Sequence, residues 1–162
     1  MNAAIETHGL TKHYGDFPAL KNLDLEVRTG EVFGFLGPNG AGKTTMIRTI
    51  LDEIRPTAGS ATILGFDTHK DSVEIRNHIG YLPGDLAMYP RLTGRDTLTY
   101  FANLRGGTDW SYVDELAERL DSDLSKKVGD LSTGNRQKVG LIHAFMNKPE
   151  AVSYTHLTLP SN

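Results

Sequence analysis

Residues 37–44 read Gly37-Pro38-Asn39-Gly40-Ala41-Gly42-Lys43-Thr44, which matches every position of the phosphate-binding pattern G-x-x-x-x-G-K-[ST]. Glycines let the backbone curl until successive N–H groups point inward at an anion. The ammonium of Lys43 supplies a charge for the β- and γ-phosphates, and the hydroxyl of Thr44 is the expected Mg²⁺ ligand. The stretch therefore predicts that the protein binds a nucleoside triphosphate, or descends from one that does.

The residues on either side of this loop support that interpretation. Residues 31–36 form an almost unbroken apolar run, which is typical of a strand buried on both faces. Apolar residues recur at helical spacing after the loop, which predicts a helix over residues 43–54 whose N-terminus favours phosphate. The order strand, loop, helix is the context that a phosphate-binding loop requires. The positions expected to contact the nucleotide are Gly37, Pro38, Asn39, Gly40, Ala41, Gly42, Lys43, Thr44 and Thr45.

A second segment precedes another amphipathic helix. Residues 131–138 read Leu131-Ser132-Thr133-Gly134-Asn135-Arg136-Gln137-Lys138, and apolar residues at helical spacing follow. A serine in this place is a common helix N-cap, and a helix N-terminus also attracts anions. From these residues alone, an ordinary cap and an anion-binding site both remain open.

Read together with the phosphate loop, this segment resembles the L-S-G-G-Q signature of the ATP-binding cassette (ABC) family. The segment keeps Ser132 and Gly134, and it departs from the signature at Thr133 and Asn135. Residues 10–15 resemble the family's stretch that carries an adenine-stacking aromatic, and Tyr14 holds that position; the alternative is a tyrosine that merely ends a strand. The resemblance covers residues 3–150.

The resemblance implies an α/β fold: a P-loop NTPase core with antiparallel N-terminal strands and a helical arm at about residues 90–130. It implies an ATP-binding subunit, with ATP and Mg²⁺ as cofactors, that hydrolyses ATP and drives separate integral membrane subunits. Two such subunits would sandwich ATP, with the signature residues Ser132, Thr133, Gly134 and Asn135 of one covering the phosphates on the other. Such a subunit would be cytoplasmic and peripheral at the inner face of the cell membrane. The stretches around residues 33–36 and 81–85 resemble exporters more than importers.

Two departures limit what the resemblance implies for catalysis. The family usually has glutamine where Gly84 stands, and glycine has no side chain to bind a metal. Asp85 could reach the metal instead. The alternative is that Asp85 belongs to a turn and its carboxylate is solvated. The Walker B Asp and the catalytic Glu would follow Glu150, but no acidic residue occurs after that position. Residues 151–162 resemble translated adaptor DNA. We therefore expect residues 1–150 to be the N-terminal part of the domain, truncated before Walker B, with a non-native tail that includes His156.

Several other functions fit less well. Residues 147–150 approach the guanine motif N-K-x-D, but they end in Glu150 and follow an amphipathic helix instead of a buried strand. Residues 45–130 contain no sustained heptads, which argues against a chromosome-type ATPase. A non-transport ABC ATPase usually carries two cassettes, and one phosphate loop is present. That function and a non-catalytic ATP-binding remnant remain the alternatives.

Composition favours a single soluble domain without nucleic-acid partners. The 162 residues carry a net charge of −3 with both signs mixed, so no basic footprint invites nucleic acid. The absence of cysteine excludes disulfides and thiolate metal sites. The N-terminus lacks the pattern of a signal peptide, and no apolar run approaches the length of a membrane-spanning helix, about 20 residues. The scattered histidines show no ligand spacing.

Overall fold

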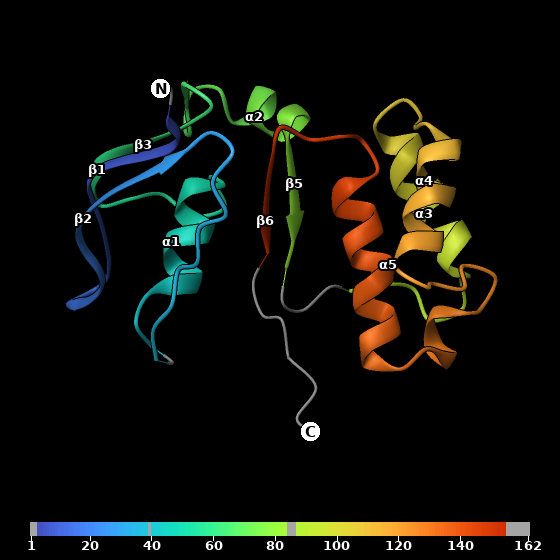
Figure 1. The fold of residues 1–162 in the computed structure, drawn as a ribbon. Coiled ribbons are helices and arrows are strands. Elements are labelled where there is room, and N and C mark those ends of the chain that lie inside the picture. Colours follow the sequence, from blue (N-terminus) through green and yellow to red (C-terminus); the bar gives the residue numbers. More distant parts are fainter. Residues whose placement is uncertain (1–2, 39, 84–86, 155–162) are drawn as a thin grey trace. The chain divides into compact units, whose positions relative to one another are not determined.

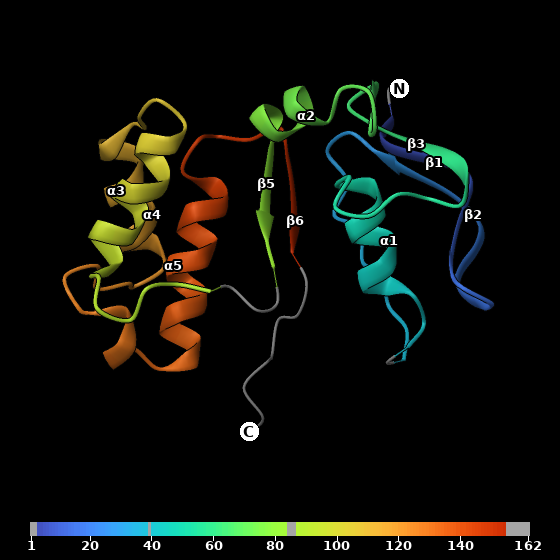
Figure 2. The same cartoon turned by 180° about the vertical axis from the view of Figure 1, so that it is seen from behind.

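The computed structural model describes residues 3–38, 40–83 and 87–154. The chain divides into two compact units, residues 1–77 and 78–162, and each builds its own sheet and core. Figures 1 and 2 show the elements of each unit from opposite sides. The phosphate loop belongs to the first unit, and the signature segment belongs to the second.

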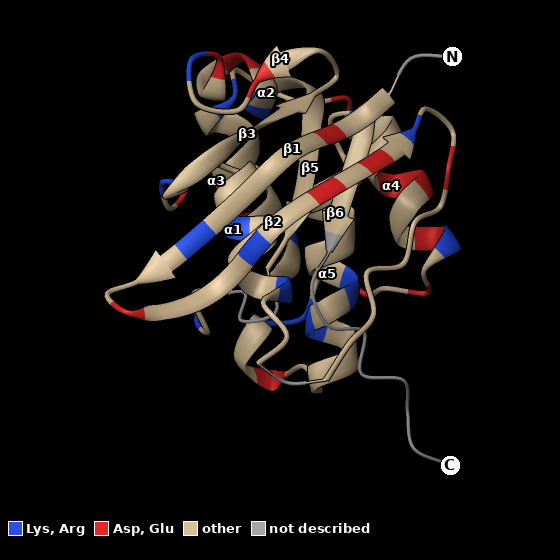
Figure 3. Ribbon diagram, turned by 90° about the vertical axis from the view of Figure 1, so that its left-hand side faces the viewer, with Lys and Arg blue, Asp and Glu red and all other residues tan. Residues whose placement is uncertain are grey.

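An antiparallel sheet organises the first unit. Strand β1 (Ala3–Tyr14) pairs with β2 (Phe17–Arg28) on one edge and with β3 (Ala58–Ile63) on the other, and β3 also pairs with β4 (Phe66–Asp67). Along residues 20–28 of β2, mostly exposed polar positions separate more buried apolar ones, as a strand with one buried face requires. Both signs of charge occur along β1 and β2 in Figure 3, in agreement with the mixed composition.

Two helices complete the first unit. Helix α1 (Lys43–Ile50) begins directly after the phosphate loop and contacts β2 and β3, and α2 (Ser72–His78) follows β4. Helix α1 is shorter than the predicted 43–54, because Leu51 caps it and Asp52 adopts a left-handed φ of 56°. The buried apolar side chains of this unit are Leu10, Leu20, Val27, Met46, Ile50, Leu51, Ala61, Ile63 and Ile75.

The prediction of a buried strand before the phosphate loop is wrong for this structure. Residues 31–38 form neither helix nor strand, and Val32 and Leu36 are 96% and 93% exposed. A strand buried on both faces needs a hydrogen-bonded neighbour on each edge and a layer on each face. The composition of the apolar run fits such a strand. Among the described residues of the first unit, however, no strand pairs with residues 31–36.

A parallel pair of strands lies in the second unit. Strand β5 (Ile79–Leu82) pairs in register with β6 (Ala151–Tyr154), from Ile79 opposite Ala151 to Leu82 opposite Tyr154. Helix α5 (Thr133–Phe145) packs against β5, and a Cβ on Gly80 would overlap the carbonyl oxygen of Ala144. The sequence predicts that residues 151–162 lie outside the fold, and the pairing of residues 151–154 with β5 corrects that prediction.

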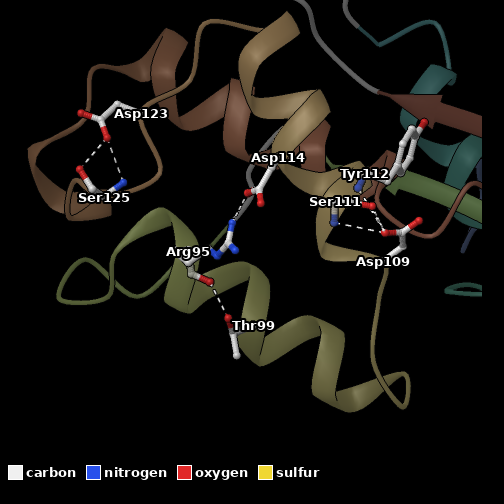
Figure 4. Close-up of polar contacts among 8 residues, drawn as sticks. All are labelled: Arg95, Thr99, Asp109, Ser111, Tyr112, Asp114, Asp123 and Ser125. Atoms are coloured by element: carbon white, nitrogen blue, oxygen red, sulfur yellow. Dashed lines mark hydrogen bonds and ion pairs between the residues drawn. The ribbon is translucent and has the colours of Figure 1, made fainter.

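Helices fill most of the stretch between β5 and α5. Helix α3 (Gly94–Leu104) begins at a capping box in which Thr93 and Asp96 bond each other's backbone. Helix α4 (Trp110–Arg119) begins at Asp109, whose carboxylate accepts from the backbone of Ser111 and Tyr112 (Figure 4). A short 3₁₀ turn, Val128–Asp130, leads into α5.

The helices of the second unit share one apolar core. Leu98 and Ala102 of α3, Val113 and Leu116 of α4, and Ile142 of α5 are buried in it. Helical periodicity predicts Val113, Leu116 or Ala117, and Leu120 as the core positions of α4; Val113 and Leu116 are buried, whereas Ala117 and Leu120 are only partly buried. The other buried members are Leu124, Leu131, Val139 and Met146. An ion pair between Arg95 and Asp114 joins α3 to α4 at the surface (Figure 4).

Candidate functional site

The phosphate loop is a curled backbone segment that ends at a helix N-terminus. Gly40 and Gly42 have φ values of 84° and 83°, a left-handed conformation that residues with a Cβ adopt at a cost. The backbone N–H of Ala41 donates to the carbonyl of Pro38 at 3.2 Å, which closes the curl. The two glycines therefore stand where the backbone geometry requires them.

Positive charge concentrates at the end of the loop. Gly42 is the N-cap of α1 and provides no side chain for the first-turn N–H groups, and that turn contains no acidic residue. The ammonium of Lys43 donates to the carbonyl oxygens of Gly37 and Pro38, the latter at 2.7 Å. Helix dipole, free N–H groups and ammonium thus favour an anion at the same place. This donor set fits a triphosphate, and the exposed Thr44 can offer its hydroxyl to a metal bound there.

The sheet of the first unit supports the loop from one side. The carbonyl of Ala19, near the start of β2, approaches Gly42 so closely that a Cβ on Gly42 would overlap it. The side chain of Leu20 is buried at the same place. Gly42 is therefore constrained twice, by its φ and by this contact, and the contact ties the helix N-terminus to the β1–β2 hairpin.

Tyr14 ends β1 and remains half exposed, at 48%. The ammonium of Lys12 lies 5.3 Å from the centroid of the Tyr14 ring and donates to the carbonyl of Arg55 at 2.7 Å. The sequence indicates Tyr14 as the candidate adenine-stacking residue and does not single out Lys12. The only signal in the sequence was the spacing of two residues along a strand, which places both side chains on one face.

The signature segment forms the exposed first turn of α5. Ser132 is the N-cap, and its hydroxyl accepts from the backbone N–H of Asn135 at 3.2 Å. Residues 132–136 are exposed, whereas Leu131 and Val139 are buried on either side of them. The first turn carries no acidic residue, so the positive helix end faces solvent. The cap interpretation of Ser132 is confirmed.

Gly134 has no local structural requirement. It lies in α5 with an ordinary φ, and a Cβ placed there would meet open space. A glycine in the middle of a helix costs about 0.5–1 kcal/mol relative to alanine, and less in the first turn, where Gly134 lies. The fold of the second unit therefore does not explain Gly134, and close approach by a group outside this unit would.

The C-terminal end of α5 is fastened to α4. Lys148 follows the helix and donates to the carboxylate of Asp109 at 2.9 Å, while its ammonium lies 4.8 Å from the Tyr112 ring centroid. The hydroxyl of Ser111 and the ammonium of Lys148 bond the Asp109 carboxylate, which lowers its pKa well below the usual range. The hydroxyl of Thr108 donates to the carbonyl of Met146 at 3.0 Å. These contacts hold the helix that presents the signature.

A buried imidazole nitrogen belongs to His143 of α5, beside α3. The ring of His143 packs against Phe101 of α3 at a tilt of 41°, with centroids 4.3 Å apart, and within the described residues its Nδ1 is buried without a hydrogen-bond partner. Burial, assisted by the nearby positive charge of Arg105, lowers the pKa of His143 to about 4. The sequence predicts no special role for His143, and the spacing of the histidines gives no indication of this environment.

Some predicted positions lie outside the described residues. They are Asn39 of the phosphate loop, the metal candidate Asp85, and the tail from residue 155, including His156. Among the residues that are described, no group of three or more His, Asp or Glu side chains could hold a metal ion. No helix in those same parts of the chain combines the length and apolar character needed to cross a bilayer.

Comparison with known proteins identifies the relatives of this chain. The model of the ABC transporter family matches residues 20–152. An uncharacterised ABC transporter ATP-binding protein of Bacillus subtilis, YhaQ, is 42% identical over 146 residues, covering 87% of this chain and 48% of that protein. The daunorubicin resistance ATP-binding protein DrrA3 of Streptomyces coeruleorubidus is 38% identical over 156 residues, covering 93% of this chain and 49% of that protein. The chain thus spans about half the length of these curated relatives.

The solved structures agree with the sequence relatives. A putative ABC transporter ATP-binding protein from Pyrococcus furiosus superposes with a TM-score of 0.79 at 28% sequence identity. The match covers 93% of this chain and 74% of that chain. The α/β P-loop NTPase fold that the family resemblance implies is therefore confirmed.

Proposed function

Because this chain belongs to the ABC transporter family, we propose that it is the ATP-binding part of a transporter and couples ATP binding and hydrolysis to transport through separate membrane subunits. The observation that carries the proposal is the phosphate loop itself. Its two left-handed glycines, the ammonium of Lys43 and the uncapped N-terminus of α1 converge on one anion site. A relative named for daunorubicin resistance supports export, since a transporter that confers resistance removes the toxic compound.

Within this proposal each residue of the loop has one task. Backbone N–H groups of residues 40–45 and the ammonium of Lys43 hold the β- and γ-phosphates, and the Thr44 hydroxyl holds Mg²⁺. Mg²⁺, when bound, neutralises charge on the phosphate oxygens. Lys43 exchanges its bonds to the carbonyls of Gly37 and Pro38 for bonds to phosphate. The site positions the triphosphate and contributes no covalent chemistry.

The signature segment has a role toward a second subunit. We assign Ser132, Thr133, Gly134 and Asn135 to the phosphates held by the other member of a dimer. Their exposure, the positive end of α5 and the open space at Gly134 support this assignment. The dimer and its membrane partners are assigned by family membership.

Hydrolysis needs carboxylates as well as this site. The family's Mg²⁺-binding Asp and water-polarising Glu would lie after Glu150, and residues 151–162 contain neither Asp nor Glu. We therefore expect residues 1–162 alone to bind ATP without turning it over.

The test of the proposal is the substitution Lys43→Ala. Loss of a charged hydrogen bond to phosphate is worth about 1.5–3 kcal/mol, so ATP affinity should fall by roughly ten- to 150-fold in calorimetric titration. Lys70→Ala provides the control, because Lys70 is an exposed lysine of the same unit outside the loop. Equal ATP affinity in the Lys43→Ala chain and the parent chain would overturn the site assignment.

A further inference from the structure

Two aromatic residues stand opposite each other at the end of the β1–β2 hairpin. Tyr14 and Phe17 are direct partners across the two-residue turn, and they are 48% and 64% exposed. Directly opposed residues of an antiparallel pair project from the same face of the sheet. Both side chains therefore project from one face at the end of the hairpin, and we call the two residues the hairpin aromatic pair.

This pair lies close to the phosphate loop along the chain of β2. Phe17 precedes Ala19 by two residues, a distance of about 7 Å along a strand. The carbonyl of Ala19 lies against Gly42, the N-cap of α1. The hairpin aromatic pair and the anion site thus belong to one unit, and the strand that carries Phe17 contacts the anion site through Ala19 and Gly42.

One face of the Tyr14 ring is already occupied. The ammonium of Lys12 lies 5.3 Å from the ring centroid, and its bond to the carbonyl of Arg55, at 2.7 Å, holds it there. A cation over a ring face stabilises the ring's orientation. The Tyr14 ring keeps 48% of its surface exposed beside this cation.

Exposure of a ring as large as that of Phe17 has no explanation in the core of the unit. Among the described residues that follow Phe17, Leu20 is the first buried apolar one. A nucleotide whose phosphates lie on α1 carries a flat aromatic base that both rings of the pair could contact. Base–aromatic stacking depends on the π face and tolerates different bases.

We propose that Phe17 is a second base-contacting residue of the nucleotide site, acting beside Tyr14, with Lys12 as the residue that positions the Tyr14 ring. This inference rests on the proposed function, because it needs a triphosphate on the phosphate loop. It adds Phe17 to the base contact that the family resemblance implies for Tyr14, and it leaves the phosphates on the loop before α1. Phe17 thereby contributes to the preference for a nucleotide over inorganic phosphate chains.

The experiment measures affinity for ATP and for inorganic tripolyphosphate by calorimetric titration in four forms of the chain: parent, Phe17→Ala, Phe17→Tyr and Tyr89→Ala. Tyr89 is the matched control, since it is an aromatic residue of similar exposure, 63%, in the other unit. We expect Phe17→Ala to weaken ATP binding by about fivefold or more and to leave tripolyphosphate binding unchanged. Phe17→Tyr should restore ATP affinity, and Tyr89→Ala should change neither ligand.

Each outcome separates the two proposals. Unchanged ATP affinity in Phe17→Ala, with a parent chain that binds ATP, overturns the role of Phe17 alone. An equal loss for ATP and tripolyphosphate also overturns it, because such a loss reports damage to the phosphate loop. A parent chain that binds neither ligand overturns the proposed function, and the inference about Phe17 with it.

Discussion

At the scale of single residues, the neutral state of His143 stabilises the second unit. Its pKa is lowered to about 4 by burial against Phe101, from a usual value near 6.5. A base whose folded pKa is depressed contributes its full stability above pH 6.5 and loses it as pH falls toward 4. Between pH 7.5 and pH 5 we expect a loss of about 2 kcal/mol in the free energy of unfolding.

The measurement is urea unfolding of the parent chain and of His143→Phe at both pH values. Phenylalanine can stack on Phe101 but does not titrate, so the extra loss at pH 5 should vanish in the variant. Carboxylates that titrate in the same range affect both proteins alike and cancel in the comparison. A pH dependence that stays the same in both proteins would show that His143 is not the responsible group.

At the scale of an element, α5 sacrifices stability at Gly134. In the first turn of a helix alanine is favoured over glycine by less than in the interior, about 0.5 kcal/mol, and a Cβ at Gly134 meets open space. We therefore expect Gly134→Ala to stabilise the second unit by about that amount in urea unfolding, while weakening ATP-dependent dimerisation in sedimentation velocity. Ala144→Gly, at a buried position in the same helix, is the opposite control: it should destabilise the unit. Intact dimerisation in Gly134→Ala would remove the argument for close approach at this glycine.

At the scale of the whole molecule, the two units have separate cores. Ligand binding stabilises the part that binds it, by about 2.7 kcal/mol when its concentration is 100 times Kd. In dilute, monomeric protein we expect ATP to slow amide exchange in β2 and α1 of the first unit, and to leave α3 and α4 of the second unit unchanged. Hydrogen exchange followed by mass spectrometry distinguishes the two sets. The Lys43→Ala chain should show no protection, and equal protection of both units would mean that they open together.

The sequence by itself determined the features that depend on local chemistry. The left-handed turns at Gly40 and Gly42, the caps at Thr93, Asp109 and Ser132, and the alternation of β2 follow from conformational preference and hydrogen bonding within a few residues. These are short-range interactions, so the identities of neighbouring residues specify them.

Only the tertiary structure decided which neighbours distant segments have. It exposed the apolar run at residues 31–36, paired residues 151–154 with β5, set Lys12 against Tyr14 and buried Nδ1 of His143. The hydrophobicity of a segment predicts that burial lowers its free energy, but it does not specify which surface covers the segment. A buried strand, an aromatic contact or a shifted pKa depends on which residues meet in space, and that is settled by packing of the whole unit.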